Sequence, residues 1–354
     1  MRWSARPRLG RLAARGDVPA AALAIVLFGV MAGVQPSVLT ASGLDLTLLG
    51  IVPLAFASVA QMIVMVGGDI DLSLGSALGL VNAICATELT QHAWVGAAEL
   101  IGFVVGYVLM GAVIELRRLP SIIVTFAFGF IWLGFALVVL PTPGGTVPAW
   151  MTQLFAYSLP GIPEPILLLV VLGGIAWMYM FSTRIGKLIR TLGNRRLSVQ
   201  QFAHRPVTVR LVMYFSASIA IVLGGFALSA DSASGDPNAG QSYLLMSVAA
   251  VIIGGGDFAG GTSWPIGTVF GAIALGFVSS LDSFLLISAN LVFALQGLLL
   301  ILALGMRRIA TVRARGGERN EVAALRNGGM HPRVERQGAA DRATVASEAG
   351  EGPV

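Results

Sequence analysis

The sequence predicts an all-α membrane protein with about ten transmembrane helices in two repeat-related halves, with broken helices and both termini cytoplasmic. Three observations predict this class. Hydrophobic residues make up 56% of the 354 residues and charged residues only 12%, whereas a soluble domain carries about 25% charged residues. Apolar runs reach about 20 residues, enough to cross about 30 Å of hydrocarbon. Two of the runs end in similar Gly-Gly-Asp segments.

Ten apolar runs are expected to span the membrane. A barrel would instead show alternating strands of about ten residues, and the 44 glycines suit helices that pack closely in lipid. The runs cover residues 18–35, 46–66, 72–87, 94–115, 121–140, 164–182, 209–230, 243–260, 265–282 and 285–304.

The positions of Lys and Arg agree with this count. They form four clusters, at residues 2–15, 117–118, 184–210 and from 307 onward, and the other long loops hold neither residue. Ten spans with a cytoplasmic N-terminus place every cluster inside, as the positive-inside rule requires. The net charge of +5 follows from this asymmetry, so membrane lipid is an expected partner and nucleic acid is not.

The chain therefore divides into three parts. Residues 1–17 form a basic cytoplasmic N-terminus, residues 18–305 the transmembrane domain with a cytoplasmic loop at 183–208, and residues 306–354 a disordered cytoplasmic tail. His92 has no second His or Cys near it, so no metal site is expected.

The first Gly-Gly-Asp segment, "GGDIDLSLGS" at residues 67–76, places two aspartates between apolar runs. A carboxylate at the centre of a lipid-facing helix costs about 2.5 to 3.5 kcal/mol. Gly67 and Gly68 free the backbone from helical geometry, and Asp69, Asp71 or Ser73 can accept hydrogen bonds from the amides that open the next helix. Two interpretations stay open, a structural or gating role and direct contact with a transported substrate.

A second segment repeats this pattern. Residues 247–273 echo residues 58–80: an apolar span, then Gly-Gly-Asp, then a Gly-Ser or Gly-Thr pair that opens the next span. Two Gly-interrupted segments in corresponding halves indicate a transport site between repeats.

The loop at 183–208 is basic and has room for one or two short helices before Pro206. It is either an ordinary positive-inside loop or a docking helix for a cytoplasmic partner. Gly186 and Lys187 are followed by Leu188, so no P-loop is present. No catalytic constellation is found either, so the chain is not expected to be an enzyme, and any nucleotide hydrolysis must come from another chain.

Three ordered segments resemble one known family. "GGDIDLSLGS" is similar to "GGIDLSVGS", residues 120–139 to "PPFIVTLATMSILRGLALV", and residues 249–273 to "AAVVLGGTSLAGGRGSVVGTLLGAL". These patterns belong to the permease subunits of bacterial ABC sugar importers of the ribose, xylose and galactose type. The resemblance covers residues 20–304. Branched-chain amino-acid permeases share the fold.

The resemblance implies a multi-pass permease subunit of the bacterial inner membrane. It would translocate a monosaccharide or similar small hydroxylated solute by alternating access. Expected partners are cytoplasmic ATPase subunits, which would bind ATP and Mg, an extracytoplasmic solute-binding protein, and a second permease copy or homologue. No cofactor is expected in this chain itself.

The expected site residues form two groups. The translocation and gating residues are Gly67, Gly68, Asp69, Asp71, Ser73, Gly75, Ser76, Gly254, Gly255, Gly256, Asp257, Gly260, Gly261, Gly267 and Thr268. The ATPase-coupling loop contributes Gly186, Arg190, Gly193, Asn194, Arg195 and Arg196.

The coupling loop departs from the family pattern. After "LGN" the family runs "xEAAxxSGI", whereas this chain has "RRLSVQQFAHRP", with Arg196 in place of Glu. A partner ATPase with altered charge is one explanation, and weak coupling is another. In the second segment Asp257 and Trp264 have no counterpart in the pattern.

Two alternatives to the sugar importer remain. An ion-coupled secondary transporter would use Asp69 and Asp71 as proton or Na⁺ sites, but would not need the basic coupling loop. An ABC permease for branched-chain amino acids or nucleosides would share the fold.

Overall fold

The computed structural model describes residues 17–155, 163–194, 205–262 and 264–285, together with Leu291, Ala294, Gly297, Leu298, Ile301 and Gly305. The chain divides into two compact units, residues 1–304 and 305–354, and the fold described here is that of the first. Apart from one isolated bridge between Gly144 and Gly235, the described residues contain no β-structure. The protein is all-helical over this part, as predicted.

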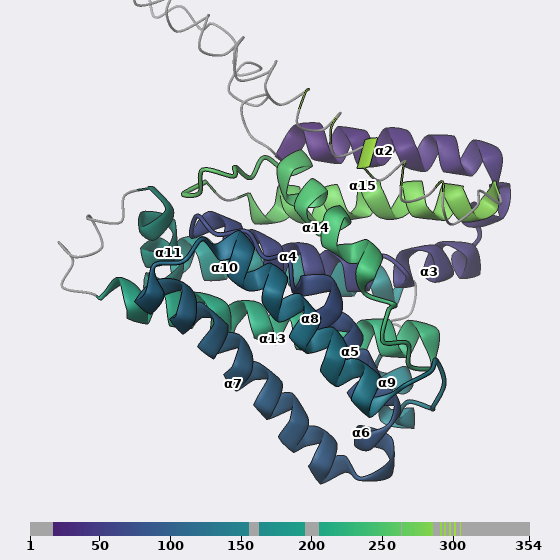
Figure 1. Ribbon diagram of the computed structural model, residues 1–354. Helices are drawn as coiled ribbons and strands as arrows, with labels where there is room; N and C mark the ends of the chain where they lie inside the picture. Colours follow the sequence, from purple (N-terminus) through teal and green to yellow (C-terminus); the bar gives the residue numbers. More distant parts are fainter. Residues whose placement is uncertain are drawn as a thin grey trace, which may run out of the picture. The chain divides into compact units, whose positions relative to one another are not determined.

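Figure 1 labels most of the helices of the described part of the chain. In chain order, the helices of this part are α2 (Asp17–Val34), η1 (Pro36–Leu39), α3 (Ala41–Leu49), α4 (Val52–Val66), α5 (Leu74–Ala86), α6 (Glu88–Gln91), α7 (Ala93–Arg117), α8 (Ser121–Val139), α9 (Ala149–Leu154), α10 (Glu164–Ser182), α11 (Arg184–Asn194), α13 (Pro206–Ser232), α14 (Gln241–Ile253) and α15 (Pro265–Phe284).

Within the described residues, 7 helices are long and apolar enough to cross a membrane. One of them, Ala41–Val66, is interrupted after Leu49 and so consists of α3 and α4. The third and eighth predicted spans correspond to the shorter helices α5 and α14, of 13 residues each. Most of the predicted tenth span, 285–304, lies outside the described residues. The count of ten therefore stays a prediction.

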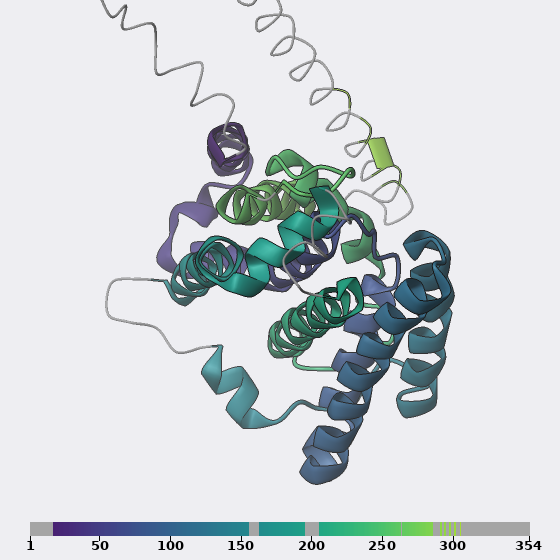
Figure 2. The same ribbon diagram turned by 90° about the vertical axis from the view of Figure 1, so that its left-hand side faces the viewer.

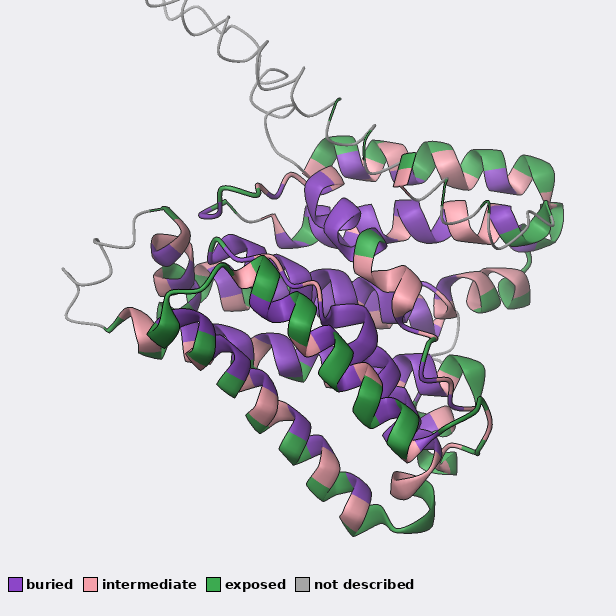
Figure 3. Ribbon diagram, in the orientation of Figure 1, coloured by how far each residue is buried: buried purple, intermediate pink, exposed green. Residues whose placement is uncertain are grey.

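Helix α4 lies at the centre of the helical unit. All its residues except Phe56 are buried, and it packs against α13, α14 and α15 (Figure 3). Small residues permit this packing: a Cβ on Gly224 of α13 would lie 3.0 Å from the Cβ of Phe56. Small residues at helix contacts are typical of helices that associate in lipid.

Outer helices present large apolar side chains on their exposed faces. On α7 these include Ile101, Val105 and Leu109, and on α8 they include Phe126 and Phe130. Helices α7 and α8 contact each other, as do α2 and α15 (Figures 1 and 2). Such surfaces are unfavourable in water and suit contact with lipid chains.

The loops expected outside the membrane contact one another at one end of the helices. The Thr146 amide donates to the Ala86 carbonyl at 3.1 Å, and Gly144 and Gly235 exchange backbone hydrogen bonds. Asn82 of α5 bonds to Ser229 of α13 at 2.8 Å. These bonds connect the ends of α5 and α13 with the segment that follows α8.

Candidate functional site

The first break lies between α4 and α5. Gly68 has φ +88°, and two hydrogen bonds close α4: Gly68 N to Met65 O at 2.9 Å, and Asp69 N to Val64 O at 3.2 Å. This pair of bonds is a Schellman motif, which favours Gly at the left-handed position. The chain therefore leaves the helix at Gly67 and Gly68, where the sequence predicts the break.

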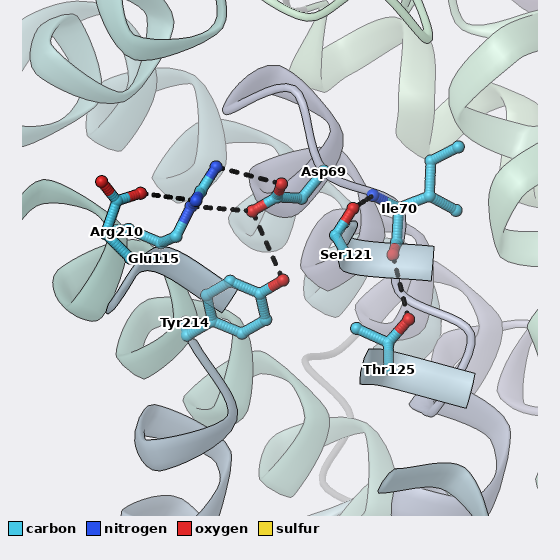
Figure 4. Close-up of polar contacts among 7 residues, drawn as sticks. All are labelled: Asp69, Ile70, Glu115, Ser121, Thr125, Arg210 and Tyr214. Carbon is cyan, nitrogen blue, oxygen red and sulfur yellow. Dashed lines mark hydrogen bonds and ion pairs between the residues drawn. The ribbon is translucent and has the colours of Figure 1, made fainter. Parts of the chain in front are cut away.

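Asp69 lies in a buried ion-paired cluster (Figure 4). Its Oδ2 is 3.0 Å from Arg210 Nε, and its Oδ1 accepts a hydrogen bond from Arg210 Nη2 at 3.1 Å. The same guanidinium contacts Glu115 Oε2 through Nη1. The Tyr214 hydroxyl donates to Asp69 Oδ2 at 3.4 Å. One guanidinium thus connects the break with α7 and α13.

Asp71 orders the turn that precedes α5, whose N-cap residue is Ser73. Its Oδ1 accepts hydrogen bonds from both the backbone N and the Oγ of Ser73, each at 2.7 Å. The Tyr107 hydroxyl of α7 donates to Oδ2. Of the three side chains expected to cap this helix, none accepts a capping hydrogen bond from its first amides: Ser73 stands at the N-cap position without one, Asp71 binds Ser73, and Asp69 pairs with Arg210.

Side chains of α8 bind the backbone on both sides of Asp71, at Ile70 (Figure 4) and at Leu72. Ser121 Oγ accepts from Ile70 N at 3.3 Å, and Thr125 Oγ1 accepts from Leu72 N at 3.0 Å. Thr125 also donates to the Ile70 carbonyl at 3.1 Å. Because unpaired backbone groups are costly at membrane depth, these two side chains stabilise the break.

Six residues of this arrangement are absent from the set that the sequence predicts: Tyr107, Glu115, Ser121, Thr125, Arg210 and Tyr214. A weak signal existed for some of them. Glu115 and Arg210 are opposite charges at the ends of apolar spans, and Ser121 and Thr125 have the i,i+4 spacing of one helix face. Nothing in the sequence connects them to Asp69.

The second break has the same local geometry as the first. Gly255 has φ +94°, and α14 is closed by Gly255 N to Ile252 O at 3.0 Å and Gly256 N to Val251 O at 2.8 Å. This is again a Schellman motif. Asp257 Oδ1 accepts from Ala259 N at 3.2 Å, which orders the loop that follows.

The end of α14 lies against the first turn of α15. A Cβ on Gly254 would lie 2.5 Å from the carbonyl carbon of Gly267. The next residue, Thr268, is fully buried, and its amide donates to the Trp264 carbonyl at 2.8 Å. The two glycines therefore allow the two backbones to approach closely.

Both breaks meet the end of α11. Gly261 N donates to the Val66 carbonyl at 2.7 Å. A Cβ on Gly193 would collide with that carbonyl oxygen and lie 2.5 Å from Gly261 N. A Cβ on Gly260 would lie 2.8 Å from the Gly68 Cα. Three segments far apart in sequence therefore touch backbone to backbone.

Helix α11 has one buried face and one exposed face. Gly186, Ile189 and Leu192 are buried, whereas Arg184 and Lys187 are exposed. A Cβ on Gly186 would lie 2.6 Å from the Met180 Cα, so this residue lets α11 pack onto the end of α10. The guanidinium carbon of Arg190 lies 4.5 Å from the centre of the Phe181 ring.

The side chain of Asn194 lies against Gly261. Arg195 and Arg196 lie outside the described residues, as does the divergent stretch 197–203.

Two expected residues take part in a different contact. A Cβ on Gly75 would lie 2.7 Å from the Gly240 carbonyl oxygen, and Ser76 Oγ accepts from Gln241 Nε2 at 3.5 Å. These contacts hold α5 to the start of α14. In the part of the chain that the structure describes, no three His, Cys, Asp or Glu side chains are grouped as metal ligands.

Comparison with known proteins identifies relatives. The family described as branched-chain amino acid transport system / permease component matches residues 43–304. The chain is 27% identical over 290 residues to the ribose import permease protein RbsC of Escherichia coli (strain K12), covering 79% of this chain and 89% of the relative.

Two further relatives are similar at the same level. The autoinducer 2 import system permease protein LsrD of Photorhabdus laumondii is 26% identical over 298 residues, with 81% of this chain and 88% of the relative covered. RbsC of Bacillus subtilis (strain 168) is 26% identical over 258 residues, with coverages of 69% and 78%. No solved structure matches the chain significantly.

Proposed function

Because this chain belongs to the permease-component family of branched-chain amino acid transport systems, we propose that it is the membrane subunit of an ATP-driven bacterial importer. Its solute is a monosaccharide or a similar small hydroxylated molecule. The names of the relatives support this class, since two are ribose import permeases and one is an autoinducer 2 import permease. The complex acts in the bacterial inner membrane by alternating access.

The contact between Gly193 and both breaks carries the proposal. An ATP-driven importer needs an element that moves with the ATPase and reaches the transport route. Helix α11 has exposed basic residues on one face, and its end touches Val66 and Gly261 without intervening side chains. A displacement of α11 would therefore act on both breaks at once, because close-packed backbones cannot absorb it.

The matching ends of α4 and α14 support two repeat-related halves. Both helices end in a Schellman motif, with Gly68 and Gly255 in the left-handed conformation. In this proposal ten spans form the two halves, with both termini in the cytoplasm. Interrupted helices at corresponding places in two repeats are typical of transporters whose solute path lies between the repeats.

The partners follow from this role. Two cytoplasmic ATPase subunits bind ATP and Mg and dock on α11, where Arg184 and Lys187 favour an acidic surface. A solute-binding protein delivers the solute on the opposite side. A second permease copy or a homologue completes the transport unit.

The experiment is solute uptake by vesicles that contain this chain, its genomically adjacent ATPase and its binding protein. Labelled ribose, xylose and galactose are offered with ATP, with ATP plus vanadate, or with an ion gradient alone. Uptake that needs both ATP and the binding protein supports the proposal. Uptake that the gradient drives without ATP contradicts it and favours an ion-coupled carrier. Competition with leucine or a nucleoside tests the remaining solute classes.

A further inference from the structure

A cavity of about 280 Å³ opens beside the first break. The break lines one side of it, and the turn between α7 and α8 lines the other. Its volume is close to the lower end of the range of about 300 to 1,000 Å³ that is usual for small-molecule sites. Its polar lining consists of Asp69, Arg118, Ser121 and Arg210.

The cavity lining carries charges of both signs. Arg118 and Arg210 are positive and Asp69 is negative, and Glu115 pairs with Arg210 from behind the cavity wall. The lining therefore holds two cations and one anion, and Glu115, which does not line the cavity, adds a second anion next to it. A neutral molecule with both donors and acceptors can pair with charged groups of either sign, whereas an ion would be repelled by the groups of its own sign.

The lining offers both hydrogen-bond donors and acceptors. Asp69 and Arg210 are each at least nine-tenths buried, and Arg210 holds the Asp69 carboxylate at two points. Guanidinium groups donate, a carboxylate accepts, and the Ser121 hydroxyl can do both. Sugar hydroxyls donate and accept as well, so a polyhydroxylated molecule can pair with each of these groups.

We propose that this cavity is a solute-binding site on the exit side of the transport route, and that it accepts a neutral polyhydroxylated molecule of monosaccharide size. The inference rests on the proposed function. It assigns direct solute contact to Asp69, Arg210 and Ser121. It also explains why a charged pair is retained at the break, where apolar residues would pack at lower cost.

Two neighbouring isoleucines allow a matched test. Ile122 lines the cavity, whereas Ile123 does not line it and is 64% exposed. Ile122→Trp fills the cavity, and Ile123→Trp adds the same bulk to the outer surface of α8. Both variants are placed in vesicles as the complete complex with ATPase and binding protein. The probe is whichever of labelled ribose, xylose and galactose the wild-type complex imports fastest.

The expected result separates transport from assembly. Ile122→Trp lowers uptake by about tenfold or more, the loss that corresponds to about 1.4 kcal/mol of binding. ATP hydrolysis stimulated by the binding protein persists in this variant, and Ile123→Trp imports at the wild-type rate. Wild-type uptake by Ile122→Trp would overturn the site. Loss of ATPase association in Ile122→Trp would overturn it too, because the cavity would then accept a protein side chain.

A second measurement tests the site even if the Ile122→Trp variant does not fold. Cys85 is the only cysteine, so Ile122→Cys in a Cys85→Ala background carries a single thiol. An uncharged methanethiosulfonate reagent should modify this thiol, and the imported sugar should slow the modification. Equal rates with and without sugar would exclude the site. If the wild-type complex imports no sugar with ATP, the proposed function fails first, independently of the cavity.

Discussion

Arg210 and Asp69, 141 residues apart in the chain, form a two-point ion pair at the first break. The Nε to Oδ2 distance is 3.0 Å and the Nη2 to Oδ1 distance is 3.1 Å. The same guanidinium contacts Glu115 of α7. Through the Arg210 side chain, Asp69 therefore connects the end of α4 to both α13 and α7.

Removal of Arg210 should destabilise the protein more than removal of the Asp69 charge. Arg210→Met leaves two buried carboxylates without a cation, a loss of about 3 to 5 kcal/mol. Asp69→Asn leaves Arg210 still paired with Glu115, so its loss is smaller. The temperature at which half the detergent-solubilised protein loses its monodisperse peak measures both effects. Arg184→Met, at an exposed position, is the control. Equal losses for Arg210→Met and Asp69→Asn would contradict this arrangement.

Tyr107→Phe should destabilise the turn that precedes α5. The substitution removes the hydroxyl that donates to Asp71, and loss of one partner of a buried acceptor costs about 1 to 3 kcal/mol. Tyr179→Phe is the comparison, because the Tyr179 hydroxyl bonds to the neutral, partly buried Ser216 at 2.5 Å. The same thermal assay should give the larger shift for Tyr107→Phe. A larger shift for Tyr179→Phe would mean that Asp71 does not depend on this hydroxyl.

Gly68→Ala should weaken the first break through the backbone alone. Its φ of +88° costs an L-residue about 1 to 2 kcal/mol. Gly29→Ala in α2 is the control, since Gly29 has no atoms near its missing Cβ. In a helix that change gains up to about 1 kcal/mol. Thermal stability should therefore fall for Gly68→Ala and stay level or rise for Gly29→Ala. If both variants change thermal stability by the same amount, the left-handed conformation of Gly68 is not required for the stability of the protein.

Gly193→Ala should uncouple ATP hydrolysis from solute transport. An alanine Cβ would collide with the Val66 carbonyl and crowd Gly261 N. Overpacking costs about 1 to 3 kcal/mol in the crowded conformation, enough to shift a two-state equilibrium by about tenfold. The measurement is the ratio of solute imported to ATP hydrolysed in vesicles. Gly174→Ala, which has open space around it, should keep the wild-type ratio. An unchanged ratio for Gly193→Ala would remove the mechanical role of this contact.

The sequence by itself determined the features that depend on local chemistry. Apolar runs predicted the helical membrane class, because a span needs only length and low polarity. The paired glycines predicted both breaks, and Gly68 and Gly255 are left-handed where the pattern placed them. The bond between Asp71 and Ser73 joins residues only two positions apart, so it too depends on local sequence, although it precedes α5 and does not cap it.

Only the tertiary structure decided how distant segments meet. The sequence grouped Asp69 with Asp71 as possible caps, yet Asp69 pairs with Arg210 across the fold. It placed Gly193 in a loop, and the fold brings that residue against Val66 and Gly261. The physical reason is that charge pairing and close backbone approach depend on which helices pack together. That packing follows from the shapes of whole helix faces, which no short stretch of sequence contains.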